Sequence, residues 1–138
     1  MGPVLRMRVG GDLREVRRLN DAAARFLAAG QANSESIHDV QLVLEEITTN
    51  VIRHGRPHGG DGAVTMDVEL EIEPASVRVR LEDDGAAFDP TSVPETPRRS
   101  DDWPGGYGLR IVRRTARGIG YRRAEDRNIL EMRVPLAS

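Results

Sequence analysis

The chain has 138 residues, a length that fits one compact domain with a substantial core. Its net charge of −2 provides no general attraction for nucleic acid, and the absence of cysteine excludes disulfides, thiolate metal sites and cysteine nucleophiles. All 20 basic residues are arginine, which excludes the lysine of P-loop phosphate sites and every lysine-based Schiff-base mechanism.

The N-terminal part of the chain predicts one strand and two helices. Residues 4–9 alternate weakly between apolar and polar side chains, which is typical of a short strand. Asp12 followed by Glu15 predicts a helix start. The apolar face of that helix consists of Leu13, Val16, Ala23, Phe26 and Leu27. Ser36 followed by Asp39 predicts the start of a second helix, which we expect to end before residues 55–60, rich in glycine and proline.

The second helix carries two distinct faces. Its apolar face follows helical spacing and consists of Ile37, Val40, Leu44, Ile47 and Val51. Glu46, Asn50 and His54 fall within an arc of about 80°, centred about 100° away from that face. A carboxylate, an amide and an imidazole therefore line the shoulder of a core helix, whereas Glu45 points to solvent.

Two interpretations of this shoulder remain open. For such a trio taken alone, an ordinary solvated helix shoulder is the favoured one. An asparagine inside a helix lowers helix stability, however, so its presence on a partly buried shoulder calls for a reason. In the functional interpretation Asn50 supplies an oxygen ligand for magnesium, Glu46 polarises a nucleophile, and His54 has a structural role.

A hairpin follows the second helix. Residues 64–72 and 77–81 alternate strictly, and pairing them about the connection 73–76 places Glu71 opposite Arg78 and Glu69 opposite Arg80. The same phase places Asp83 on the apolar side of the sheet and Asp84 on the solvent side. A buried carboxylate needs a polar partner, because its desolvation is otherwise costly.

The segment that starts at Asp83 also has two interpretations. Aspartate and glycine are common in turns, so the segment predicts at least a strand end and a turn. In the functional interpretation Asp83 accepts the exocyclic amine of adenine, and Gly85 lets the ring approach the backbone. Phe88 is interpreted as a core residue.

Residues 85–108 show no periodicity, and a loop of this length in a small domain is often a functional lid. Its end is rich in glycine and precedes a helix predicted over residues 108–117, whose N-terminus offers N–H groups to phosphate. The basic stripe on that helix suits solvent as well as it suits phosphate or an acidic protein; it consists of Arg110, Arg113, Arg114 and Arg117. Two closing strands are predicted over residues 120–124 and 129–136, with Leu130, Met132 and Val134 facing inward.

The order of these motifs resembles the GHKL ATPase superfamily. Residues 46–50 together with His54 are similar to its N box, residues 83–85 to its first glycine box, and residues 106–109 to its second. Among the smaller members, the bacterial anti-sigma-factor serine kinases carry a segment that most resembles EITTNVIRHG.

This resemblance implies an α/β (α+β) fold in a single domain over residues 1–138. The expected architecture is a two-layer sandwich, in which a mixed, mainly antiparallel sheet is covered on one face by about three helices. ATP is expected between the helices and the sheet, beneath a lid at approximately residues 85–108.

The resemblance also implies roles for individual residues. Glu46 is expected to act as the general base, Asn50 to hold Mg²⁺, and Asp83 to bind the adenine amine. Further contacts to the nucleotide are expected from Gly85, Ala87, Gly106, Gly108 and Leu109. Two departures weaken the match: Ala87 replaces a glycine of the first box, and residues 127–129 stand where many relatives carry a Gly-Thr pair, so one hydroxyl contact near the base is expected to be missing.

The function implied by the resemblance is an ATP- and Mg²⁺-dependent serine/threonine protein kinase that acts as an anti-sigma factor. Its expected partners are an anti-sigma-factor antagonist, which it phosphorylates, an RNA polymerase sigma factor and a second copy of itself. With no signal peptide or membrane-spanning segment in the sequence, we expect a cytoplasmic location and neither membrane nor direct nucleic-acid binding.

The alternative is a nucleotide-gated module of the same fold that binds a partner without kinase activity. The two departures favour this alternative slightly, and the presence of Glu46 argues against it. A two-component histidine kinase is disfavoured, because no dimerising phospho-acceptor helix pair precedes the domain in the sequence given. A nucleic-acid reader would need a net-basic domain with its arginines on one face, and only the Arg110–Arg117 stripe approaches that pattern.

Overall fold

A computed structural model describes residues 2–54, 64–92 and 108–137. In chain order the described elements are β1 (Val4–Gly10), α1 (Leu13–Ala29), α2 (Ser34–His54), β2 (Thr65–Ile72), β3 (Ser76–Asp83), the 3₁₀ turn η1 (Pro90–Ser92), α3 (Gly108–Thr115), β4 (Arg117–Ala124) and β5 (Arg127–Pro135). In this part of the chain, no helix is long and apolar enough to cross a bilayer.

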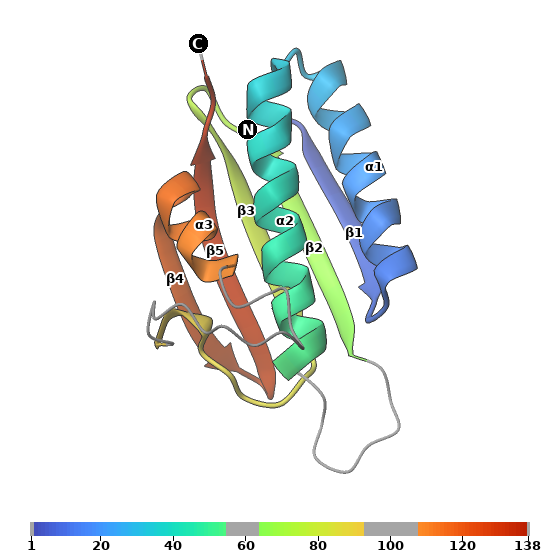
Figure 1. The fold of residues 1–138 in the computed structure, drawn as a ribbon, viewed down its shortest axis with the longest axis vertical. Coiled ribbons are helices and arrows are strands. Elements are labelled where there is room, and N and C mark those ends of the chain that lie inside the picture. Colours follow the sequence, from blue (N-terminus) through green and yellow to red (C-terminus); the bar gives the residue numbers. More distant parts are fainter. Residues whose placement is uncertain (1, 55–63, 93–107, 138) are drawn as a thin grey trace.

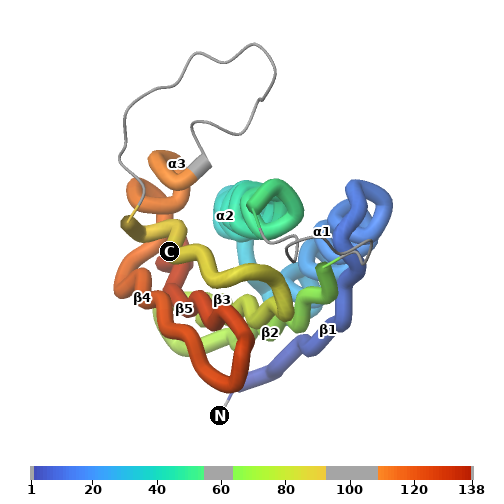
Figure 2. The backbone as a smooth tube through the Cα atoms, turned by 90° about the horizontal axis from the view of Figure 1, so that it is seen from below, coloured from blue at the N-terminus to red at the C-terminus, as the bar shows by residue number. Residues whose placement is uncertain are grey.

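The architecture is an α+β sandwich of two layers. The five strands form one sheet in the order β1-β2-β3-β5-β4, and all the pairings between neighbours are antiparallel. The three helices lie side by side on one face of this sheet, with α2 between α1 and α3 (Figure 1). Figure 2, seen along the layers, shows that no helix of the described residues lies over the other face. The predicted fold class is therefore confirmed.

The helix starts are set by side chains that cap the first backbone N–H groups. Asp12 Oδ1 accepts from the Glu15 N–H at 2.9 Å, which confirms the predicted start of α1. The predicted cap of α2, Ser36, is wrong by three residues, because Asn33 caps this helix instead: its Oδ1 accepts from the Ser36 N–H at 2.9 Å. Ser36 itself is buried, and its hydroxyl accepts from the Ala137 N–H near the end of the chain.

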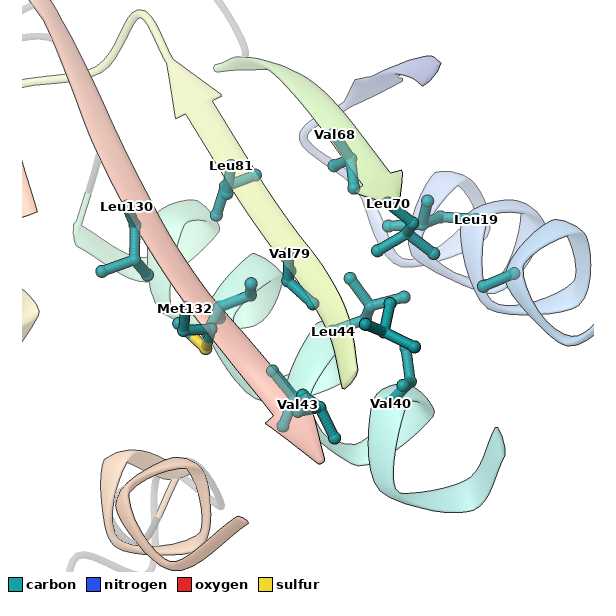
Figure 3. Packing of buried hydrophobic residues seen from close by; sticks show 14 of the residues in the cluster. Leu19, Val40, Val43, Leu44, Val68, Leu70, Val79, Leu81, Leu130 and Met132 are labelled. Carbon is teal, nitrogen blue, oxygen red and sulfur yellow. The ribbon is translucent and has the colours of Figure 1, made fainter. Parts of the chain in front are cut away.

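The core lies between the helices and the sheet, with α2 at its centre. Figure 3 shows Val43 and Leu44 of α2 facing Val79 of β3 and Met132 of β5. Val40, Leu44 and Ile47 are buried as their spacing predicts, whereas Ile37 and Val51 are partly buried. Val43, which the predicted apolar face omits, is fully buried. In α1 the prediction for Leu13 is wrong, since 61% of this residue is exposed at the first position of the helix.

The hairpin register is the predicted one, with Glu71 opposite Arg78 and Glu69 opposite Arg80. On the open face of the sheet, Arg78 pairs with both glutamates, while Arg80 turns to Glu82 at 3.5 Å. The Arg78 pairs are partly buried, and like charges brought together in a shifted register would repel. The ion pairs therefore help to fix which residues of β3 face the core, and Asp83 is one of these buried residues.

Most of the predicted lid, residues 93–107, lies outside the described residues. At its beginning, residues 84–92 follow β3 and include the η1 turn; at its end, Gly108 is the first residue of α3. The last two strands form a hairpin in which Leu130, Met132 and Val134 are buried as predicted. β4 begins earlier than predicted, at Arg117, with an irregular pairing between Arg117 and Gly120.

Leu44→Ala should lower the free energy of unfolding by about 2–5 kcal/mol, because truncating a fully buried leucine leaves a cavity. Urea denaturation followed by circular dichroism measures this change. Leu13→Ala is the matched control, and at its exposed position we expect a change below about 0.5 kcal/mol. Equal losses at the two positions would contradict the placement of α2 over the core.

Candidate functional site

A hollow opens between α2 and the end of the sheet where β3 stops. Its lining is mostly apolar. The lining residues are Ile47, Asn50, Val51, Leu81, Asp83, Phe88, Pro90, Tyr121, Asn128 and Leu130. An apolar pocket with few convergent polar groups is typical of a small-molecule site. Asn50 and Asp83, 33 positions apart in the sequence, thus line one hollow.

Asp83 is buried at the last position of β3, with 4% of its surface exposed. Its Oδ1 accepts from the Gly85 N–H and from Asn128 Nδ2, each at 2.9 Å. Its Oδ2 accepts no hydrogen bond from any described residue. Burial raises the pKa of Asp83, and the hydrogen bonds from Asn128 and Gly85 oppose that rise. One oxygen of this carboxylate is therefore held by the protein, and the other is open to a donor in the hollow.

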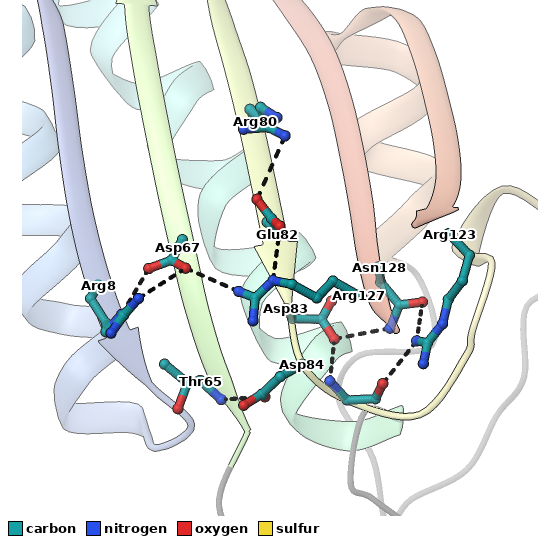
Figure 4. A network of polar contacts seen from close by, with 11 residues as sticks. Arg8, Thr65, Asp67, Arg80, Glu82, Asp83, Asp84, Arg123, Arg127 and Asn128 are labelled. Atoms are coloured by element: carbon teal, nitrogen blue, oxygen red, sulfur yellow. Dashed lines mark hydrogen bonds and ion pairs between the residues drawn. The ribbon is translucent and has the colours of Figure 1, made fainter. Parts of the chain in front are cut away.

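The Asp84 side chain points to solvent and not into the core, as the strand phase predicts. It is exposed, and its Oδ1 accepts from the Thr65 N–H at 2.8 Å (Figure 4). This contact ties the end of β3 to the start of β2. Of the two neighbouring acids, only Asp83 lines the hollow.

Asn128 is the polar residue that the sequence analysis missed. It is buried directly opposite Asp83 in the β3–β5 register, within residues 127–129, where relatives of the GHKL type were expected to carry a Gly-Thr pair. Figure 4 shows its amide between Asp83 and Arg123. A signal for it existed in the sequence: the inward phase of Val134, Met132 and Leu130, extended by two residues, reaches Asn128.

Five hydrogen bonds hold the Asn128 amide. Its Oδ1 accepts from Tyr121 Oη at 2.5 Å, from Arg123 Nη1 at 3.1 Å and from the Phe88 N–H at 3.4 Å. Its Nδ2 donates to Asp83 Oδ1 and to the Ala86 carbonyl oxygen, each at 2.9 Å. Arg123 also donates to the Gly85 carbonyl oxygen at 2.9 Å. The amide thus joins β4 and β5 to the segment that follows β3.

On α2, Asn50 and Glu46 are both without a side-chain partner among the described residues. Asn50 lines the hollow, so its amide is free to contact a ligand there. Glu46 lies one helical turn earlier, about 6 Å along the axis, and is not among the lining residues. It is half-buried, and burial, together with the charge of Glu45, raises its pKa. Glu45 is exposed, as predicted.

His54 and Phe88 meet at the end of α2. Their rings stack with centroids 4.3 Å apart and planes 27° from parallel. Burial, together with the charge of Arg53, lowers the pKa of His54, which favours a neutral ring. The interpretation of Phe88 as a plain core residue is therefore incomplete, because it both stacks on His54 and lines the hollow.

The other residues predicted to contact the nucleotide lie at different places relative to the hollow. Gly85 is buried and donates its N–H to Asp83, so it helps to orient that carboxylate. Ala87 is exposed and Leu109 is partly buried on α3, and neither lines the hollow. Gly108 starts α3, and Gly106 lies outside the described residues.

The donor set of the hollow suits a nucleotide better than it suits a metal ion held by protein alone. Among the described residues, no group of three histidine or acidic side chains could hold a metal. Magnesium in nucleotide sites takes only one or two protein ligands, with phosphates and water as the rest. A free amide oxygen at Asn50 fits that arrangement, and the open Oδ2 of Asp83 fits a base amine.

Comparison with known proteins agrees with this geometry. A family model described as the histidine kinase-like ATPase domain matches residues 10–134. The chain is similar to the serine/threonine-protein kinase BtrW of Bordetella bronchiseptica, with 32% identity over 94 residues. That stretch covers 66% of this chain and 65% of the kinase, slightly less than two thirds of the relative.

A solved structure has the same fold. It is described as the crystal structure of the RsbU and RsbW domains of a Mycobacterium tuberculosis protein, and it aligns with a TM-score of 0.67 and 15% identity. The alignment covers 99% of this chain and 33% of that chain.

Glu46→Gln should make the protein more stable relative to the wild type as the pH rises from 4 to 7. The pKa of Glu46 is raised in the folded state, so ionisation of this carboxyl above its unfolded pKa of about 4.3 opposes folding. Glutamine removes that cost. Thermal unfolding at several pH values measures the difference, with the exposed Glu125→Gln as control. A difference that shrinks towards neutral pH would contradict the burial assigned to Glu46.

Proposed function

This chain belongs to the histidine kinase-like ATPase domain family, and on that basis we propose that it is an ATP- and Mg²⁺-dependent serine/threonine protein kinase. As a member of this family it is a kinase-like ATPase domain that binds ATP. The proposed acceptor is a serine or threonine of a small protein that antagonises an anti-sigma factor. The proposed role in the cell is that of an anti-sigma factor, which also binds a sigma factor.

The observation that carries the nucleotide part of the proposal is the open oxygen of Asp83. An ionised carboxylate only accepts hydrogen bonds, and adenine presents a donating amine at the position where guanine presents a carbonyl oxygen. A buried acceptor left unpaired costs about 1–3 kcal/mol, and more when charged, so the hollow should reject bases that lack the amine.

The proposed phosphoryl acceptor is activated by Glu46. Its carboxylate has no hydrogen-bond or ion-pair partner among the described residues, so it is free to take a proton. Its raised pKa makes it a stronger base than an ordinary glutamate. In the proposed step the hydroxyl proton passes to Glu46 while the serine oxygen bonds to the γ-phosphorus, and the bond from that phosphorus to ADP breaks.

Asn50 is the proposed protein ligand of magnesium. Its amide lines the hollow one helical turn from Glu46, so the metal, the phosphates and the base would follow one side of α2. Magnesium supplies neutralisation of the phosphate charge when bound. The protein's part is to orient the nucleotide and to keep Glu46 beside the transferred group.

The proposed partners follow from the relatives. BtrW is named a serine/threonine-protein kinase, and the neighbour in the Mycobacterium tuberculosis structure is named an RsbW domain. A homodimer is proposed as well, with β1 and α1 at one end of the two-layer sandwich as its surface.

A competing function is a nucleotide-gated module that captures a partner but transfers no phosphate. One observation favours it: Glu46 does not line the hollow that Asn50 and Asp83 share. Incubation with γ-labelled ATP and candidate antagonist proteins separates the two functions, because only a kinase transfers label to protein.

Glu46→Gln should reduce phosphoryl transfer by a factor on the order of 10²–10⁴ and leave Mg²⁺-ATP affinity nearly unchanged, since the general base acts only in the chemical step. Single-turnover transfer and equilibrium ATP titration measure the two quantities. Glu45→Gln, at the exposed neighbouring position, is the matched control and should retain transfer. Full activity in Glu46→Gln would remove this residue from the mechanism.

Asn50→Ala should weaken ATP binding at least about tenfold in the presence of Mg²⁺ and change it little in EDTA, because the lost amide oxygen acts through the metal. Thr49→Ala, a neighbouring change on the same helix outside the hollow, is the control. Equal weakening with and without the metal would show that Asn50 contacts the nucleotide directly.

A further inference from the structure

The orientation of the Asn128 amide is fixed by the groups around it. Three donors converge on its oxygen, from Tyr121, Arg123 and the Phe88 N–H, and two acceptors face its nitrogen, from Asp83 and Ala86. If the amide turned over, its NH₂ group would face the Arg123 and Phe88 donors and its oxygen would face two acceptors, so four of the five contacts would be lost, and only the Tyr121 hydroxyl, which can also accept, would keep one. Asn128 therefore has one orientation in which its N–H points at Asp83.

We infer that Asn128 is a positioning residue that sets base specificity, because it holds Asp83 as an acceptor with one open oxygen. This inference rests on the proposed role of Asp83 in adenine recognition. Asn128 and the Gly85 N–H occupy Oδ1, so the carboxylate cannot rotate without losing both bonds. Only Oδ2 is left for the base.

Among the groups around Asp83, the Asn128 amide favours the ionised carboxylate most strongly. Asp84, the next residue, disfavours the ionised form, whereas Arg123 of β4 favours it less strongly than the Asn128 and Gly85 hydrogen bonds do. The Tyr121 phenol donates to Asn128, not to Asp83. The α2 side chains that line the hollow are all uncharged, namely those of Ile47, Asn50 and Val51.

The same amide also holds the segment that follows β3. It donates to the Ala86 carbonyl and accepts from the Phe88 N–H, and Phe88 lines the hollow. A change at Asn128 should therefore act on affinity as well as on specificity. The two effects are separable, because a displaced segment weakens all purine nucleotides alike, whereas an altered Asp83 changes the preference between them.

The deciding experiment measures the ratio of ATP to GTP affinity between pH 6 and 8.5, for wild type and Asn128→Asp. Phosphate ionisation affects both nucleotides equally and cancels in this ratio. The substitution replaces the donor to Asp83 by a second carboxyl group, and two adjacent carboxyls raise one pKa and share a proton.

In Asn128→Asp the preference for ATP should fall at least about tenfold as the pH is lowered from 8.5 to 6, because Asp83 then holds part of a proton and is a weaker acceptor. In wild type the ratio should change less than about twofold. Asn33→Asp is the matched control, since this exposed residue caps α2 through an oxygen that aspartate retains. A ratio in Asn128→Asp that equals the wild-type ratio at every pH overturns the inference.

Two further variants complete the test. Asn128→Ala removes the donor to Asp83 without adding a carboxyl group, so it decides the question if Asn128→Asp fails to fold; a fall in the ATP-to-GTP ratio supports the inference, and an unchanged ratio overturns it. Asp83→Asn tests the proposed function separately. If it keeps the ATP preference, base recognition by Asp83 is wrong; if it loses the preference while Asn128→Asp behaves like wild type, only the inference fails.

Discussion

The site depends on the burial of one carboxylate, that of Asp83. A charge at the inner end of a strand is stable only if donors reach it, and here they come from the turn through Gly85 and from β5 through Asn128. Asn128 is its cross-strand neighbour, so the pairing of β3 with β5 determines whether the carboxylate is supported. The register of the sheet therefore determines which strand side chains line the hollow.

The alternation of side chains along a strand divides structural roles from site roles between adjacent residues. Arg127 points to the open face, where it pairs with Glu82 and Asp67, whereas Asn128 points into the hollow (Figure 4). Asp83, the last residue of β3, and Asp84, which follows it, divide in the same way. A slip of one residue in either strand would exchange these roles; in β5 it could place Arg127 in the pocket, and in β3 it would bring Glu82 or Asp84 to the position of Asp83. The ion pairs of the open face therefore protect the site by opposing such a slip.

Sequence patterns predicted the features that depend on a repeated period. The hairpin register and the burial of Asp83 follow from strict alternation, and the inward faces of α2 and β5 follow from helical and strand spacing. Features that depend on single contacts were not predicted, such as the capping of α2 by Asn33. Asn128 was missed because its inward phase was noted only for its apolar neighbours. The position of Glu46 relative to the hollow needed the packing angle of α2 on the sheet, which periodicity does not contain.

The placement of Glu46 has a consequence for the role of the metal. A carboxylate one helical turn from Asn50 would repel the phosphates of a nucleotide whose base contacts Asp83. In the proposed function a bound divalent cation would offset this repulsion, and Asn50 would hold it through an uncharged amide that adds no negative charge. Burial acts in the same direction, since the raised pKa of Glu46 reduces its charge when no cation is near. In the proposed function, therefore, Glu46 as base and Asn50 as metal ligand depend on each other, because the bound cation would offset the repulsion between the Glu46 carboxylate and the phosphates.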